Sequence, residues 1–120
     1  MVHIILYKHI YEFGCKHPQY AEVLKAWVSL VEDCNWEKPQ DIKNDFSSTD
    51  IITKKDNKPN TKMPNRAVFD IKGNHIRIIV KYQFFKKQKK CKLYLKWIGT
   101  HAEYTKLCEK SLQYDIDSFG

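Results

Sequence analysis

Residues 66–104 read RAVFDIKGNHIRIIVKYQFFKKQKKCKLYLKWIGTHAEY, and this stretch decides the fold. It contains three runs rich in β-branched and aromatic residues, RAVFDI, HIRIIVKYQFF and KLYLKWI, a composition typical of β-strands. The first two runs are separated by KGN, a short turn of permissive residues, and the last two by the charged KKQKKC. Short connections join antiparallel neighbours, so the stretch predicts a three-stranded antiparallel meander.

Alternation along these strands separates an apolar face from a basic face. The apolar face collects Ala67, Phe69, Ile71, Ile76, Ile78, Val80, Tyr82, Leu93, Leu95 and Trp97. The opposite face carries Arg66, Arg77, Lys81, Lys92, Tyr94 and Lys96, and the same alternation places Ile98 on that side. We therefore expect an open basic platform with one aromatic ring on it, and helices that cover the apolar face.

The N-terminal half supplies those helices. VHIILY at the start predicts a short strand, and Ile10, Phe13 and His17 then repeat at helical spacing until Pro18 interrupts the pattern. From residue 19 to 35 the apolar residues fall on one stripe at steps of three and four, which predicts the main helix. A shorter helix follows Pro39. The polar segment 47–65 predicts a loop, with an extended piece at 50–53 and a mobile tip.

Together these patterns predict an α+β fold with N-terminal helices on one face of a small antiparallel sheet and a short C-terminal helix. The 120 residues, 42% of them hydrophobic, fit one domain over 1–120, with a loop at about 53–65 and a tail at 109–120 that follows no clear pattern. No run of about 18 apolar residues and no usual signal peptide is present, so we expect a cytoplasmic protein without a membrane segment.

Cofactor signals are missing from the sequence. The four cysteines are widely spaced and form no Cys-x-x-Cys pair, which argues against a zinc ribbon and against a disulfide framework. Neither a Gly-rich nucleotide loop nor a nucleophile elbow is present. We therefore expect no metal and no cofactor.

Charge is distributed unevenly along the chain. The formal net charge is +7, but residues 54–96 hold fourteen Lys and Arg against two Asp, a balance of +12. The rest of the chain holds seven Lys and Arg against twelve Asp and Glu, a balance of −5. Attraction to phosphate adds up over contacts and steers approach, so this asymmetry predicts a preferred side for a polyanion.

The junction between the third strand and the following helix, GTHAEY, is the candidate site. Thr100 and Glu103 match a capping box, with His101 at the first helical position and Tyr104 three residues further on. A helix N-terminus attracts phosphate oxygens and disfavours an imidazolium ion, so His101 could move a proton there. Alternatively, His101 is a half-exposed turn residue and Tyr104 a core aromatic that packs with Leu107.

RAVFDIKGNHIRIIVKY followed by GTHAEY resembles the signature of the HigB-type toxins, the ribosome-dependent mRNA endonucleases of type II toxin–antitoxin pairs in the RelE superfamily. Upstream, KHIYEFGCKHPQYAEVLKAWVSLVEDCNWEKPQDIKNDF is similar to the paired helices of that family, so the resemblance covers roughly residues 2–107. It implies a RelE-like α+β fold that enters the ribosomal A site and cuts mRNA without metal, through attack of the ribose 2′-hydroxyl. It also implies a cognate antitoxin, which we expect to be a helix-turn-helix protein of HigA type.

The resemblance also suggests site residues. It implies a catalytic set made of Arg77, Lys96, His101 and Tyr104. Either His101 or Tyr104 could serve in proton transfer or base stacking. We expect RNA binding by the surrounding residues Arg66, Lys72, His75, Lys81, Lys92 and Tyr94.

Two other functional classes fit the same residues. The chain could be a non-catalytic RNA-binding module that uses the basic face with Tyr94 for stacking, or an interaction protein that docks an acidic partner. Substitution of the junction residues separates the first class from an endonuclease. A steep salt dependence, which phosphate contacts produce, separates RNA binding from the second.

Overall fold

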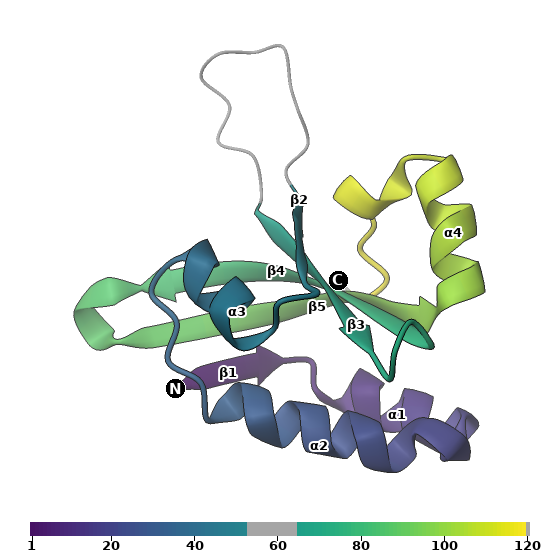
Figure 1. Ribbon diagram of the computed structural model, residues 1–120, viewed down its shortest axis with the longest axis horizontal. Helices are drawn as coiled ribbons and strands as arrows, with labels where there is room; N and C mark the ends of the chain where they lie inside the picture. The colour runs from purple at the N-terminus through teal and green to yellow at the C-terminus, as the bar shows by residue number, and fades with distance from the viewer. Residues whose placement is uncertain (53–64, 120) are drawn as a thin grey trace.

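The computed structural model describes residues 1–52 and 65–119. These residues form four α-helices and a five-stranded sheet, and the predicted α+β class is confirmed (Figure 1). The strands are β1 (Val2–Ile5), β2 (Asp50–Ile52), β3 (Arg66–Ile71), β4 (Ile76–Phe85) and β5 (Lys90–Thr100). The helices are α1 (Lys8–Lys16), α2 (Ala21–Glu32), α3 (Pro39–Asp45) and α4 (His101–Glu109), with 3-10 turns η1 (Pro18–Tyr20), η2 (Lys86–Gln88) and η3 (Leu112–Tyr114).

The sheet has the strand order β1-β5-β4-β3-β2. The predicted antiparallel meander is confirmed as β3-β4-β5, and β2 adds an antiparallel edge strand where an extended piece was expected. The sheet is nevertheless mixed, because β1 pairs in parallel with β5, Val2 beside Cys91 and Ile5 beside Tyr94. A parallel pair needs a long connection, and here the helices and the other strands supply it. The predicted loop tip at 53–64 lies outside the described residues.

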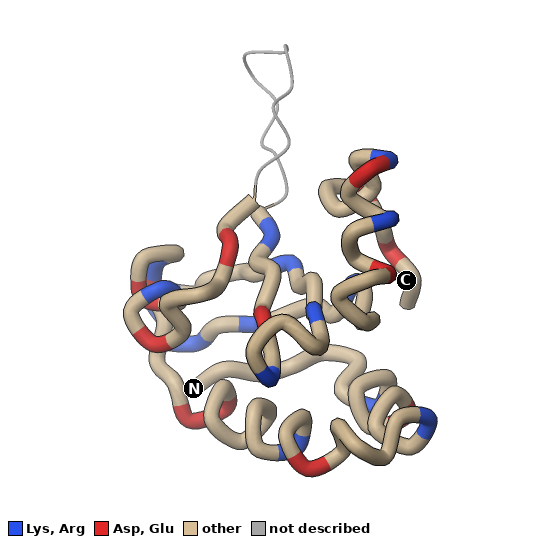
Figure 2. Tube along the Cα trace, turned by 45° about the vertical axis from the view of Figure 1, so that its right-hand side comes forward, with Lys and Arg blue, Asp and Glu red and all other residues tan. Residues whose placement is uncertain are grey.

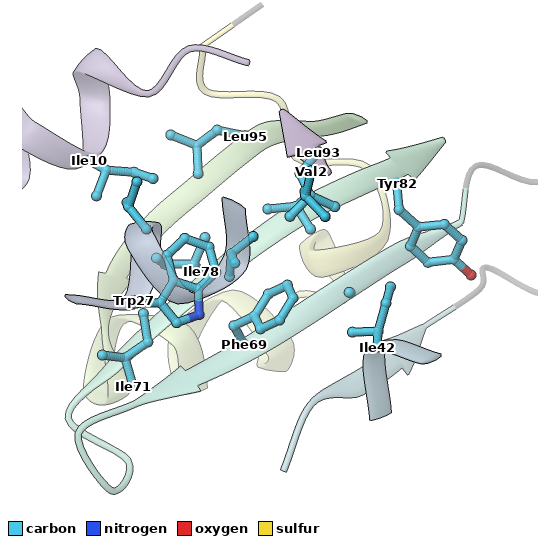
Figure 3. Close-up of a cluster of buried hydrophobic side chains, with 14 of the residues drawn as sticks. Val2, Ile10, Trp27, Ile42, Phe69, Ile71, Ile78, Tyr82, Leu93 and Leu95 are labelled. Carbon is cyan, nitrogen blue, oxygen red and sulfur yellow. The ribbon is translucent and has the colours of Figure 1, made fainter. Parts of the chain in front are cut away.

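The N-terminal helices cover one face of the sheet, as predicted. In Figure 1, α1 and α2 lie together along one side of the strands. The Leu24, Trp27, Val28 and Val31 side chains of α2 are buried there. Figure 3 shows Trp27 beside Phe69 of β3, with the two ring centres 5.1 Å apart and the rings edge to face. Burial of this apolar stripe fixes the sheet against the helices.

The second face is not an open platform, and that expectation is wrong for its central part. α4 and the C-terminal tail, residues 110–119, pack on it. A small apolar cluster forms there around Val68, Ile79 and Leu107, all of them buried. Ile116 of the tail packs against the same cluster. The free part of this face is therefore limited to its two ends.

A β-bulge explains why simple alternation fails at the end of β5. Ile79 pairs with Trp97 and Val80 pairs with Leu95, so Lys96 is an extra residue on β5. One extra residue reverses the alternation beyond it. Trp97 therefore packs on the second face and Ile98 against the main core, the reverse of the sequence prediction for both residues.

Candidate functional site

The start of α4 is fixed by the predicted capping box. The Thr100 amide donates to Glu103 Oε1 at 2.9 Å, and the Glu103 amide donates to Thr100 Oγ1 at 3.3 Å. The His101 amide donates to the His75 carbonyl oxygen at 3.2 Å. The amides of His101 and Glu103 are thus bonded within the protein, so this helix end offers a phosphate fewer free donors than the sequence suggested. The His101 side chain itself is exposed.

The turn between β3 and β4 lies next to this helix start. Lys72, Gly73 and Asn74 all have positive φ, at 55°, 54° and 75°, and the Asn74 amide donates to Asp70 Oδ1 at 2.8 Å. His75 Nδ1 lies 3.3 Å from the Tyr20 hydroxyl at the end of η1. Both Lys72 and His75 are exposed, so these two predicted RNA-binding residues are open to solvent beside the start of α4.

Arg77 is held in one orientation behind that turn. Its Nη2 donates to Asn74 Oδ1 at 2.8 Å, and its Nη1 lies 3.7 Å from Asp70 Oδ2. Asp70 is also its partner in the β3–β4 register. The side chain is 12% exposed, and its Nε has no hydrogen-bond partner among the described residues. Asp70 and Asn74 were not predicted as supports for Arg77: a three-residue KGN turn would pair Asp70 with Ile76, whereas the observed turn is one residue longer and pairs Asp70 with Arg77.

Tyr104 joins Arg77 to α4. The guanidinium carbon lies 5.5 Å from the centre of the Tyr104 ring, which also packs on Trp97 at 6.0 Å between ring centres. Burial, followed by the interaction with Cys108, raises the pKa of the Tyr104 hydroxyl well above its usual value, so the group is a neutral phenol. The ring packs with the Leu107 cluster, as the alternative interpretation of Tyr104 supposed.

Arg66 does not lie on an open face, and that prediction is wrong. The residue is 5% exposed, and its Nη1 donates to the Ile116 carbonyl at 2.7 Å and to the Gln113 carbonyl at 3.3 Å. Burial lowers the pKa of its guanidinium, an effect that Asp115 and Asp117 oppose. Arg66 therefore ties the tail to the sheet. The tail carries no periodic pattern from which this could have been predicted.

Lys96 lies under the tail as well. Its Nζ bonds Asp117 Oδ2 at 3.1 Å, its carbonyl accepts from the Ser118 amide at 2.9 Å, and its side chain is 14% exposed. The sequence pattern predicted that Lys96 would be an open cation beside His101. The bulge and the tail instead give Lys96 a carboxylate partner.

The remaining predicted residues lie toward the β4–β5 turn. Lys81 is exposed and pairs in register with Tyr94, whose hydroxyl donates to Gln83 Oε1 at 3.0 Å. Lys92 Nζ lies 5.3 Å from the centre of the Phe85 ring. Four residue steps separate Lys81 from Arg77 along β4, about 13 Å at the usual rise of a strand. In Figure 2 the strands carry mostly Lys and Arg, whereas the N-terminal helices carry both signs of charge.

The predicted platform thus divides in two. At one end is the junction, formed by His75, Arg77, His101 and Tyr104. At the other is the hairpin surface, formed by Lys81, Lys86, Lys87, Lys89, Lys90 and Lys92. Within residues 1–52 and 65–119, no group of three or more His, Cys, Asp or Glu could hold a metal ion. No helix in the same residues is long and apolar enough to cross a membrane.

Comparison with known families decides what this arrangement belongs to. Residues 20–107 match the HigB toxin family, described as the RelE-like toxic component of a toxin–antitoxin system. The chain belongs to the HigB toxin family. The match takes in the junction and the hairpin surface, and it ends before the tail that holds Arg66 and Lys96. No curated protein matches the chain significantly. Membership of the HigB family implies an antitoxin as partner.

Proposed function

We propose that this HigB toxin is a ribosome-dependent endoribonuclease that cuts mRNA during translation. In the reaction, a ribose 2′-hydroxyl attacks the adjacent phosphate, the bond to the 5′-oxygen of the next nucleotide breaks, and a proton passes from the attacking to the leaving oxygen. The products are a 2′,3′-cyclic phosphate or its 3′-phosphate, and a 5′-hydroxyl. The chemistry needs in-line orientation, compensation of the phosphorane charge and proton movement.

Arg77 carries the proposal. Its guanidinium is oriented by Asp70 and Asn74, it rests on the Tyr104 ring, and its Nε has no partner among the described residues. An oriented guanidinium suits the forked geometry of a phosphate. The Arg77 side chain is 12% exposed, and this exposed part is what a phosphate can reach.

His101 is the group we assign to proton movement. Its imidazole is exposed at the start of α4, next to the turn that carries His75. An imidazole can accept or donate a proton near neutral pH, whereas the buried phenol of Tyr104 stays protonated. We therefore assign Tyr104 to supporting Arg77 and donating a hydrogen bond, and His101 to acid–base work. Lys96 can contribute its charge only if Asp117 releases it.

The partners follow from the same proposal. We expect the antitoxin to be a helix-turn-helix protein of HigA type, and the ribosome with its mRNA to be the target. Both would place the toxin in the cytoplasm. Acidic residues of the antitoxin could pair with the basic surface of the sheet. Alternatively, the antitoxin could cover the surface by which the toxin enters the ribosome.

Induction of the toxin alone tests the proposal. Bacterial growth should stop, and primer extension should map cuts within translated regions of mRNA. Purified ribosomes programmed with a defined mRNA should then reproduce the cut, while the same mRNA without ribosomes stays intact. If mRNA remains whole in both settings although the protein binds RNA, the chain is the non-catalytic RNA-binding module that the sequence also allowed.

A further inference from the structure

The β4–β5 hairpin is the most basic element of the described chain. It carries the six lysines of the hairpin surface, and between Asp70 and Glu103 the sequence contains no Asp or Glu. Lys86, Lys87, Lys89 and Lys90 are all exposed at its turn. In the antiparallel register Lys92 pairs with Gln83 and Lys90 with Phe85, so Lys81, Lys90 and Lys92 share one face of the hairpin. The basic face formed by these three lysines thus continues at the turn into Lys86, Lys87 and Lys89.

These lysines are too far from the junction to take part in the cut. Eight residue steps separate Arg77 from Phe85 on β4, about 26 Å at the rise of a strand. In Figure 1 the β4–β5 turn and α4 lie at opposite ends of the molecule. Charges are screened over about 8 Å at physiological ionic strength. Lys86, Lys87, Lys89 and Lys90 therefore cannot stabilise charge at a phosphate held by Arg77.

The chemistry of the turn favours a phosphate backbone over unpaired bases. Proteins that hold single-stranded RNA usually stack its bases on aromatic rings. The turn residues Lys86, Lys87, Gln88, Lys89 and Lys90 include no aromatic, and the neighbouring Phe85 is only partly exposed and lies beneath Lys92. Lysine is a hydrated point charge on a flexible stem, which suits phosphates whose positions are set by a helix. Double-helical RNA is recognised largely through its backbone.

We propose that the β4–β5 hairpin is a docking arm for the phosphate backbone of double-helical ribosomal RNA. The arm binds the ribosome while the junction, at the other end of β4, meets the mRNA. This inference rests on the proposed function, since it takes the ribosome to be the site of action. Association and cleavage are then carried by separate groups of residues.

The test measures binding to vacant bacterial ribosomes, which carry no mRNA and so require no cleavage. Lys86→Gln/Lys87→Gln is compared with Lys16→Gln/Lys43→Gln, which removes the same charge from exposed positions on α1 and α3. Each lost phosphate contact lowers the slope of log affinity against log salt by about 1. Binding is measured between 50 and 200 mM salt, where phosphate contacts dominate the affinity. The hairpin variant should bind more weakly, and its slope of log affinity against log salt should be smaller by about 2. The control variant should match the unaltered toxin.

Three results would overturn the docking arm. Equal affinity and slope for the two double variants would mean that the hairpin does not touch ribosomal RNA. If the hairpin variant lost affinity only for a single-stranded mRNA oligonucleotide, the hairpin would bind mRNA and not ribosomal RNA. If the hairpin variant lost affinity only for the copurifying antitoxin, the hairpin would be part of the toxin–antitoxin interface. Failure of the proposed function looks different: the unaltered toxin would leave mRNA whole while the hairpin variant still lost ribosome binding.

Discussion

The guanidinium of Arg77 lies over the ring of Tyr104, with 5.5 Å between the guanidinium carbon and the ring centre. This contact joins β4 to α4, so the strand that carries the cation and the helix that begins with His101 are fixed relative to each other. A cation over an aromatic face contributes about 0.5 to 2 kcal/mol, depending on its exposure to solvent. Asp70 and Asn74 hold the other side of the guanidinium. Arg77 therefore links β3, the β3–β4 turn and α4 at the junction.

Arg77→Ala should relieve growth arrest and slow single-turnover cleavage on programmed ribosomes by about a hundred- to a thousandfold, the usual effect of removing an electrostatic stabiliser. Arg77→Lys should recover only a small part, because it keeps the charge but loses the forked donors. Circular dichroism and thermal unfolding of both variants provide the control. Full activity of a well-folded Arg77→Ala protein would remove the observation on which the proposed function rests.

Arg66 should behave as a structural residue. Arg66→Met leaves the carbonyls of Ile116 and Gln113 without their donor, and an unpaired buried polar group costs about 1 to 3 kcal/mol. Urea unfolding should show that loss. Lys81→Met is the matched control, since Lys81 is the register partner of Arg66 but is exposed, and it should hardly change stability. Equal stability of the two variants would mean that Arg66 does not anchor the tail.

Tyr104 should affect alkaline stability. Its pKa in the folded chain is raised from 10.0, chiefly by burial. Below pH 10 the phenol is neutral in both states and contributes no pH dependence. Above pH 10 the unfolded chain loses that proton more readily, so the free energy of unfolding falls as pH rises. Thermal midpoints between pH 8 and 11 should therefore fall less in Tyr104→Phe than in the unaltered chain. Parallel curves for the two proteins would mean that the hydroxyl is not buried.

The sequence predicts most of the fold because the patterns that indicate its helices and turns involve residues close together in the chain. The stripe of α2, the KGN turn and the capping box at Thr100 depend on neighbouring residues, and each lies where expected. The parallel pairing of β1 with β5 could not be predicted, because it joins residues about ninety positions apart and a strand pattern does not name its neighbour.

The candidate site was predicted less well, for two physical reasons. One is the extra residue Lys96, which leaves no mark on composition but reverses the facing of Trp97 and Ile98. The other is the tail, whose contacts with Arg66 and Lys96 come from single residues without a period. The alternation of basic residues along the strands therefore predicted an open second face, whereas α4 and the tail cover its central part in the structure. Arg77 keeps its predicted facing because the extra residue lies on β5 and not on β4, and His101 stays at the first position of α4 because the capping box fixes that end.

Gly99 should be needed for the end of β5. A Cβ added there would meet the Cη2 and Cζ2 atoms of Trp97 at 2.5 Å, so the indole ring would have to move. Overpacking of this kind costs about 1 to 3 kcal/mol, so Gly99→Ala should lower stability by that amount in urea unfolding. Trp97→Phe removes the colliding atoms. Gly99→Ala should therefore lower the free energy of unfolding much less when it is added to Trp97→Phe than when it is made in the unaltered chain. An additive double variant would exclude a clash between Gly99→Ala and the ring.

His101 should carry the proton in the cleavage reaction. Its side chain is exposed at the first position of α4, beside the turn that orients Arg77. A general acid or base contributes about a hundred- to ten-thousandfold, so His101→Gln should slow single-turnover cleavage by an amount in that range. Ribosome affinity should barely change, because the lysines of the sheet supply it. His3→Gln, at an exposed position on β1, is the control and should cut at the normal rate on saturating ribosomes.

The products of the cut make the cleavage prediction specific. The cut should leave a 2′,3′-cyclic or 3′-phosphate and a 5′-hydroxyl, and it should continue with EDTA if the ribosomes stay intact. A 3′-hydroxyl product would exclude attack by the 2′-hydroxyl. An unchanged rate in both His101→Gln and Tyr104→Phe would reduce the junction to a capped helix packed on a strand, because neither side chain would then take part in the chemistry.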